Sequence, residues 1–158
     1  MKSVPDFCDE YSDKIQILQI NFKNFGAVDK FCGEIVTVKC PEDNSLLRRL
    51  LEDDGTGKVL VVNGGASNAC AYLGDNLALL ACHNNWAGIL INGMVRDVDE
   101  LAKMQIGIKA LGAHPKKSEK RGLGKFGHDI EFGGVKFQSG AFVYSDNNGV
   151  IVSSSQLL

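Results

Sequence analysis

The spacing of hydrophobic and polar positions changes along the chain, and these changes predict most of its elements. Between Phe7 and Leu18 apolar side chains recur at helical spacing, which predicts a helix from Asp6 to Gln19, with Asp6 capping its start. Residues 33–40 are rich in β-branched side chains and predict a strand that Pro41 ends.

The middle of the chain alternates between strand and helix patterns. Apolar runs that end in Gly or Asn indicate buried strands, and amphipathic stretches between them indicate helices. We expect a helix from Asn44 or Asp43 to Gly55 and a strand through KVLVVNGG. A helix at 75–85, a strand at 88–92, a short helix at 97–104 and a strand at 106–114 follow. Such alternation is typical of an α/β architecture.

The pattern changes again after His114. Residues 114–126 are rich in Lys, Gly and Ser and predict a surface loop. Residues 129–153 contain short strand patterns separated by Gly-Gly, Ser-Gly and Asn-Asn-Gly, as in an antiparallel meander. We therefore expect one domain over residues 1–158, with an α/β centre and an all-β end.

Composition narrows the class of protein. The 158 residues carry a net charge of −2, and the one basic run, Lys116 to Arg121, is broken by Glu119. We interpret this run as a solvated loop, and we expect no direct nucleic-acid partner because phosphate binding needs a concentrated basic patch. No apolar stretch is long enough for a signal peptide or a membrane helix. Five cysteines without a C-x-x-C pair predict reduced, mostly buried thiols, so we expect a cytoplasmic protein.

Common catalytic motifs are missing. The chain has no G-x-S-x-G, H-E-x-x-H or G-x-x-x-x-G-K-[ST], and Gly64-Gly65 does not extend into G-x-G-x-x-G. The histidines His83, His114 and His128 are scattered, and we interpret them as surface or capping residues.

The segment from Leu73 to Glu100 holds the candidate chemistry. Gly74-Asp75-Asn76 leads into one helix, and Arg96-Asp97 leads into the next. Both turns are expected on the carboxyl side of strands, where ligands bind in α/β sheets. Backbone N–H groups at a helix start and an arginine can hold a carboxylate, and an aspartate offers a hard oxygen ligand for Mg²⁺.

A purely structural interpretation fits the same residues. Asp97 followed by Glu100 is close to a capping box, Asp75 can cap the helix that begins at Asn76, and Arg96 can be a surface residue. Spacing alone leaves both interpretations open.

At these residues the chain resembles the RraA-like family over nearly its whole length. The matching blocks are GEIVTVKCPEDNSLL, GKVLVVNGGAS, NNWAGILINGMVRDVDEL, IGIKALGAHPKK and YSDNNGVIVS. The family includes 4-hydroxy-4-methyl-2-oxoglutarate aldolases, which also decarboxylate oxaloacetate, and proteins described as inhibitors of ribonuclease E. Its aldolase branch carries an Asp, twenty intervening residues, then Arg-Asp, two residues and an acidic one. Asp75, Arg96, Asp97 and Glu100 match this pattern, whereas some regulator-type members lack the aspartate after the arginine.

The resemblance implies a role for each matching residue. Asp97 would bind Mg²⁺ or Mn²⁺, Arg96 would hold the substrate and stabilise charge on its oxygens, and Asp75 and Glu100 would orient water or handle a proton. The substrate, a 2-oxo acid, would bind in a site formed by Gly74, Asp75, Asn76, Leu77, Ala78 and Arg96. The backbone N–H groups of residues 75–78 would receive its carboxylate. A Schiff-base mechanism would need a buried lysine. Lys103 and Lys109 lie nearby, but no pattern marks either as buried.

The resemblance also implies an α/β/β/α sandwich similar to swivelling phosphohistidine domains, assembled as a homotrimer with sites between subunits. Two functions follow: a metal-dependent lyase that cleaves 4-hydroxy-4-methyl-2-oxoglutarate to pyruvate, or a protein inhibitor that binds ribonuclease E through its surface. The Arg96-Asp97 pair favours the lyase.

Overall fold

Parallel strands form the centre of the molecule. The computed structural model describes residues 1–157. The central strands are β3 (Phe31–Lys39), β4 (Lys58–Asn63), β6 (Gly88–Val95) and β7 (Gly107–Ala113), and the short β5 (Ala71–Leu73) pairs with the end of β6. All pair in parallel in the order β3-β4-β6-β7. The predicted α/β centre is confirmed, and β5 is an addition to it.

The strand β4 shows why the central runs are continuously apolar. Val59 and Val61 face one hydrophobic cluster, whereas Leu60 and Val62 face another. Successive side chains in a strand point to opposite faces, so a strand covered on both sides needs apolar residues at every position.

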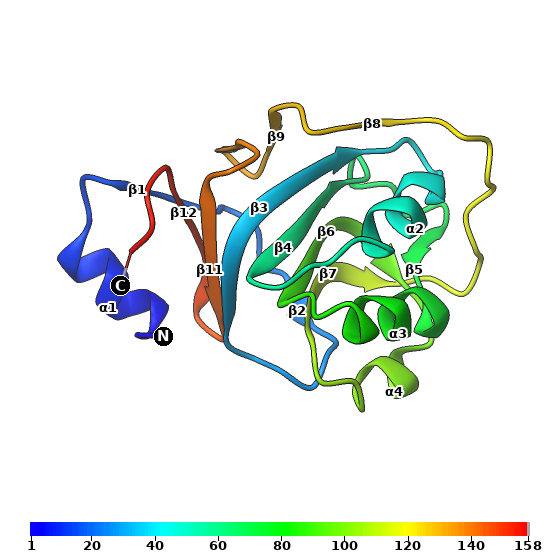
Figure 1. Ribbon diagram of the computed structural model, residues 1–158, viewed down its shortest axis with the longest axis horizontal. Coiled ribbons are helices and arrows are strands. Elements are labelled where there is room, and N and C mark those ends of the chain that lie inside the picture. The colour runs from blue at the N-terminus through cyan, green and yellow to red at the C-terminus, as the bar shows by residue number, and fades with distance from the viewer. Residues whose placement is uncertain (158) are drawn as a thin grey trace.

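Three helices cover one face of this sheet: α2 (Ser45–Leu51), α3 (Asp75–His83) and α4 (Val98–Leu101), as Figure 1 shows. The Trp86 ring packs at the base of this layer, where its indole N–H donates to the Asp53 carbonyl at 3.1 Å. A Cβ on Gly55 would lie 2.1 Å from the ring, so glycine is required there. None of the helices in residues 1–157 has the length and apolar character needed to cross a bilayer.

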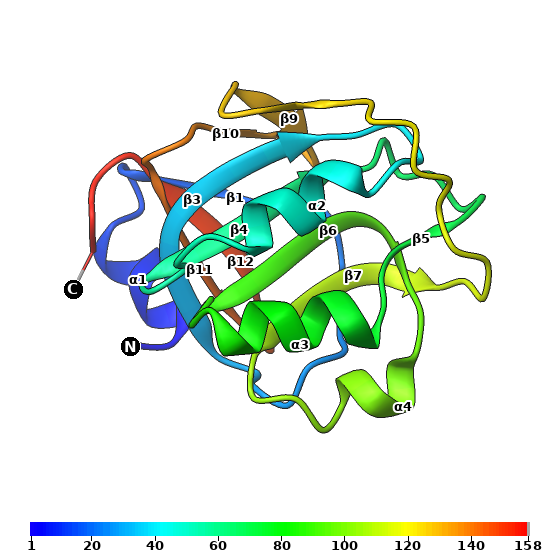
Figure 2. The same cartoon turned by 45° about the vertical axis from the view of Figure 1, so that its right-hand side comes forward.

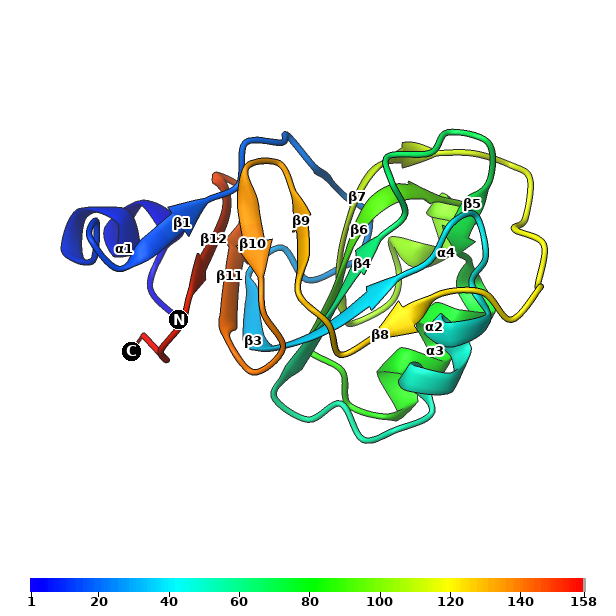
Figure 3. The same cartoon turned by 90° about the horizontal axis from the view of Figure 1, so that it is seen from above.

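The other face of the sheet is covered by the all-β end. The strands are β9 (Ile130–Phe132), β10 (Val135–Phe137), β11 (Phe142–Asp146) and β12 (Gly149–Ser153), and β11 pairs antiparallel with both β3 and β12. Outside them lies α1 (Val4–Glu10), whose Phe7 packs against Tyr144. Figure 3 shows the four layers in sequence, from α1 through the two β layers to α2, α3 and α4. The predicted α/β/β/α arrangement is confirmed, and its likeness to phosphohistidine domains stays a prediction.

The predicted helix from Asp6 to Gln19 is wrong over its second half. The helix begins at Val4, is capped by the Ser3 hydroxyl, which accepts from the Asp6 N–H at 3.2 Å, and ends at Glu10. The chain then forms β1 (Ile15–Ile17), which pairs with β12. Pairing with a strand far along the chain overrides the helical spacing, as tertiary context often does. Two more short strands, β2 (Lys23–Asn24) and β8 (Lys125–Phe126), add to β7 and β3.

Lys109 is buried, although no sequence pattern marked it as buried. Its side chain on β7 is 3% exposed, and its ammonium donates to the backbone carbonyl of Asp146 at the end of β11. Burial lowers the pKa of this lysine, against the opposing influence of the Asp146 and Asp29 carboxylates. The burial depends on the contact of β7 with the end of β11, which lies 37 residues further along the chain, so no local sequence pattern marks it.

Candidate functional site

The two turns predicted to carry the chemistry lie side by side. Leu73, at the end of β5, pairs with Val95, at the end of the parallel β6. Gly74-Asp75 follows the first strand and Arg96-Asp97 the second, and Figure 2 shows α3 and α4 leaving this same end of the sheet. The carboxyl ends of parallel strands are where α/β folds place ligands.

Hydrogen bonds join the two turns directly. The Arg96 N–H donates to the Leu73 carbonyl at 2.9 Å, and the Asp75 N–H donates to Oδ2 of Asp97 at 3.0 Å. A Cβ on Gly74 would lie 2.6 Å from that same Oδ2. Glycine at residue 74 therefore leaves room for the Asp97 carboxylate, which any larger side chain there would displace.

The backbone of Asp97 is strained. Its φ of 56° and ψ of 41° place it in the left-handed region, which residues other than glycine rarely adopt. Asp97 occupies the N-cap position of α4, yet its side chain makes no capping hydrogen bond. The capping-box interpretation is therefore wrong, because the carboxylate turns away from α4 toward the other turn. Strain of this kind is concentrated at functional sites.

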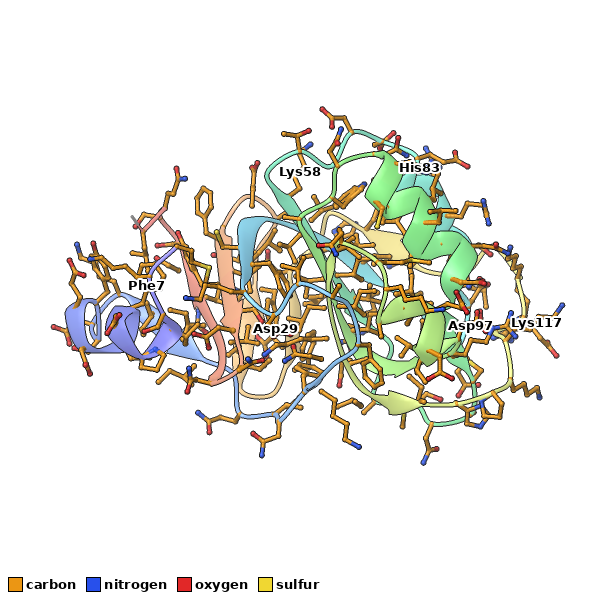
Figure 4. The ribbon with its side chains drawn as sticks, turned by 90° about the horizontal axis from the view of Figure 1, so that it is seen from below. Phe7, Asp29, Lys58, His83, Asp97 and Lys117 are labelled. Atoms are coloured by element: carbon orange, nitrogen blue, oxygen red, sulfur yellow. The ribbon has the colours of Figure 1, made fainter. Side chains whose placement is uncertain are left out.

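A cavity of about 540 Å³ opens beside these turns. It is lined by β5 and its following turn, by Arg96 and Asp97, by α2, and by the segment after β7. The charged side chains among the lining residues are Arg48, Asp75, Arg96, Asp97, Lys117, Glu119 and Lys120. Figure 4 shows Asp97 and Lys117 at the same end of the molecule, opposite Phe7. A mixed lining with several cations suits a small polyanion such as an oxo acid.

The start of α3 offers fewer free donors than the sequence predicts. Of the N–H groups of residues 75–78, that of Asp75 is taken by Asp97, and that of Ala78 donates to the Gly74 carbonyl at 3.1 Å. Within residues 1–157 the N–H groups of Asn76 and Leu77 have no acceptor, and both residues line the cavity. These two donors can receive an anion at the helix start.

The remaining predicted residues differ in their placement. Arg96 lines the cavity, and its guanidinium forms no ion pair with a carboxylate of the described residues 1–157. Glu100 lies outside the cavity lining and faces Lys103, with 3.6 Å between their charged atoms. Ala78 is fully buried behind the turn. The structure thus brings Gly74, Asp75, Asn76, Leu77, Arg96 and Asp97 together and leaves Glu100 and Ala78 at a distance from the cavity.

The donor atoms present fit a hard divalent cation bound through one carboxylate. In the described part of the chain, no three His, Cys, Asp or Glu side chains are grouped so as to hold a metal. Asp97 is exposed, and no donor in residues 1–157 reaches its second oxygen, Oδ1. An open carboxylate oxygen suits Mg²⁺ or Mn²⁺, which commonly keep several waters and complete their shell with substrate.

Sequence reasoning missed one wall of the cavity. The predicted surface loop does lack regular structure up to Lys125, but Lys117, Ser118, Glu119 and Lys120 line the cavity. Asn44 on the other side also lines it, and both Ser118 Oγ and Asn44 Oδ1 are buried without a hydrogen-bond partner in the described chain. A Lys-rich run with a buried serine in its middle carries no periodic signal, so only the fold locates it.

Comparison with known proteins supports one family. The family described as RraA-like: Aldolase/RraA matches residues 4–152. A protein of Pseudomonas fluorescens (strain Pf0-1), provisionally named 4-hydroxy-4-methyl-2-oxoglutarate aldolase, is 53% identical over 153 residues, covering 97% of this chain and 94% of its own length.

Two solved structures share the fold under other names. One, from Geobacillus kaustophilus HTA426, is called S-adenosylmethionine: 2-dimethylmenaquinone methyltransferase. It superposes with a TM-score of 0.97 and is 42% identical in sequence, and the match covers 99% of this chain and 97% of that chain. The other, the RNA-processing inhibitor RraA from Thermus thermophilis, has a TM-score of 0.96, 38% identity, and coverage of 100% and 96%. With a family match over nearly its full length and relatives above half identity, the chain belongs to the RraA-like family.

Proposed function

We propose that this protein is a divalent-metal-dependent lyase that cleaves 4-hydroxy-4-methyl-2-oxoglutarate into two molecules of pyruvate. The observation that carries the proposal is the placement of Arg96 and the strained Asp97 on a cavity at the carboxyl ends of β5 and β6. The relative of 53% identity that bears an aldolase name supports the same reaction. The fold alone does not identify the reaction, because similar proteins bear three different activity names.

The cleavage is a retro-aldol reaction. The C4 hydroxyl loses its proton, the C4–O bond becomes a carbonyl and the C3–C4 bond breaks. Its electron pair passes to C3 and the C2 oxygen as an enolate. Protonation at C3 gives the second pyruvate, so atoms and electrons balance without a further reactant. Asp75, half-buried in the lining, is the carboxylate positioned to accept the hydroxyl proton and return it.

The charges of the substrate have matching partners in the cavity. Arg96 binds oxygens of the 2-oxo acid through its planar guanidinium and stabilises the charge that develops there. The free N–H groups of Asn76 and Leu77 receive a carboxylate. Asp97 would hold Mg²⁺ or Mn²⁺, which when bound supplies Lewis-acid stabilisation of the enolate oxygen.

Decarboxylation of oxaloacetate is proposed for the same site. Loss of CO₂ leaves the same pyruvate enolate, so the groups that stabilise one reaction stabilise the other. Glu100, which the family resemblance assigns to proton handling, lies outside the cavity of the single chain. Its role, like the homotrimer with sites between subunits, stays a prediction.

A second candidate function is inhibition of ribonuclease E through surface binding, with the cavity secondary. The observation in its favour is the 38% identity to a structure named an RNA-processing inhibitor. The open Asp97 carboxylate and the Arg96 guanidinium, which forms no ion pair within residues 1–157, favour the lyase, because a surface inhibitor requires neither.

The test is pyruvate release from 4-hydroxy-4-methyl-2-oxoglutarate and from oxaloacetate, with Mg²⁺ or Mn²⁺ and again with EDTA. We expect saturable release that EDTA removes and that exceeds the metal-only background. Absence of release from both acids would overturn the lyase proposal, and binding to ribonuclease E would then be measured on the same preparation.

A further inference from the structure

The cavity wall formed after β7 is attached to the rest of the fold at both ends. In Figure 1 this segment, yellow in the colour scale, arches around the edge of the molecule past β5 before β8. At its start the Ala71 N–H of β5 donates to the Lys116 carbonyl at 2.8 Å. At its end the Arg121 and Leu123 N–H groups donate to Oδ2 of Asp43 at 2.7 and 3.0 Å. The residues between these two attachments include those that line the cavity.

Asp43 is a buried carboxylate whose two oxygens accept hydrogen bonds from different parts of the chain. Its side chain is fully buried, and its Oδ1 accepts from the N–H of Ser45 at 2.8 Å and from the Ser45 hydroxyl at 2.5 Å. Its other oxygen, Oδ2, accepts from Arg121 and Leu123 in the segment after β7. Burial alone would raise the pKa of the carboxyl, but the hydrogen bonds from Ser45, Leu123 and Arg121 lower it to about 2. Asp43 therefore stays ionised at physiological pH.

Ser118 lies in the middle of the attached segment. It is 4% exposed and lines the cavity, and its hydroxyl has no hydrogen-bond partner within residues 1–157. A buried hydroxyl without a partner has lost its hydrogen bonds to water without replacement, which is unfavourable. Buried polar groups in native folds are nearly always hydrogen-bonded, so a ligand in the adjoining cavity is a candidate partner for this hydroxyl.

We propose that Ser118 binds a substrate oxygen atom through its hydroxyl and that Asp43 is the positioning residue that holds the Ser118 segment against the cavity. The proposal rests on the proposed function, because it gives the lyase site an additional binding group. Asp43 does not line the cavity and acts through the N–H groups of Arg121 and Leu123.

The chain contains a matched control for Asp43. Asp54 makes the same local turn, since its Oδ1 accepts from the N–H and hydroxyl of Thr56 at 3.1 and 2.7 Å. Asp54 is exposed and makes no hydrogen bond to the segment after β7. In Asp43→Asn the local turn can persist through Oδ1, but the amide NH₂ replaces the oxygen that accepts from the segment.

The experiment measures amide hydrogen exchange and steady-state kinetics on the full chain with Mg²⁺. We expect Asp43→Asn to accelerate exchange at Arg121 and Leu123 by at least about tenfold, because their acceptor is lost. It should also raise KM by about tenfold with a smaller change in kcat. Ser45→Ala, which removes a donor to Asp43 and the acceptor of the Gly122 N–H, should give a smaller change in the same direction. Asp54→Asn should match wild type in both measurements.

A double-mutant cycle separates positioning from general loss of structure. Ser118→Ala should raise KM on its own, and the Asp43→Asn/Ser118→Ala double variant should show no further rise, because Asp43 acts through Ser118. Additive KM effects, or wild-type exchange in Asp43→Asn, would overturn the proposal. If Asp43→Asn does not fold, Ser45→Ala carries the same comparison. If wild type releases no pyruvate, the lyase itself fails, and the exchange data still decide whether Asp43 holds the segment.

Discussion

The two turns at the ends of β5 and β6 and the buried contact between β7 and β11 use charged residues in opposite ways. At the turns, Asp97 is exposed with one oxygen open and Arg96 has no ion-pair partner in the described chain. At the contact, Lys109 is buried and donates to the Asp146 carbonyl, while the Asp146 carboxylate accepts from the Val4 and Asn148 N–H groups at 2.8 Å.

This difference indicates that the turns serve ligand binding and that the buried contact serves stability. A charged side chain at a cavity that still has free hydrogen-bonding atoms can bind a ligand. The charged groups of Lys109 and Asp146 instead find their partners in the central sheet, the all-β end and α1, and they hold these layers together. Changes at the turns should therefore reduce activity and leave stability nearly intact, and changes at the buried contact should do the reverse. Variants in the two regions test this division.

The largest effect is expected from Asp97→Ala. Loss of a cavity carboxylate that combines a strained backbone with an open oxygen should lower metal-dependent turnover by at least about 10³-fold. The Asp75 N–H loses its acceptor, which should cost only about 1 kcal/mol of unfolding free energy. The measurement is kcat together with thermal unfolding, with the exposed Asp99→Ala as a control. Unchanged turnover would remove Asp97 from the site.

Arg96→Lys should have the next largest effect. Lysine keeps the charge but cannot form two parallel hydrogen bonds, so kcat/KM should fall by about 10²-fold. Arg49 is a matched control, since it lies over the Phe126 ring at 5.6 Å and outside the cavity lining, and Arg49→Lys should keep normal kinetics. Wild-type kinetics in Arg96→Lys would contradict the carboxylate-binding role.

Lys109→Met tests the other side of the comparison. Removing the ammonium leaves the buried Asp146 carbonyl without its donor and should lower the unfolding free energy by about 1–3 kcal/mol. The kcat per folded molecule should not change. Denaturant unfolding and turnover are measured in parallel, with the exposed Lys14→Met as reference. A large loss of kcat without loss of stability would show that the division is wrong.

The smallest effect is expected on acidification. The folded-state pKa of Asp43 is lowered from 3.8 to about 2, so its contribution to stability is present above its unfolded value and is lost as pH falls through that range. Between about pH 4 and pH 2, wild type should lose more stability than Asp43→Asn, which has no carboxyl to protonate there. Parallel unfolding curves for the two proteins across this range would contradict the role of the ionised form.

Local patterns in the sequence determined much of this protein. The apolar run of β4 required a strand covered on both faces, and Arg96-Asp97 and Gly74-Asp75 were placed correctly at helix starts after strands. These inferences succeed because side-chain periodicity and strand-to-helix turns depend on neighbours within a few residues.

Tertiary structure alone decided the rest. The pairing of β1 with β12, the burial of Lys109 and the hydrogen bonds of Arg121 and Leu123 to Asp43 each join residues far apart in the chain. The same holds for the left-handed Asp97, whose carboxylate leaves its own helix to accept from Asp75. Such contacts depend on how the layers pack, and local sequence patterns do not show which distant residues come into contact.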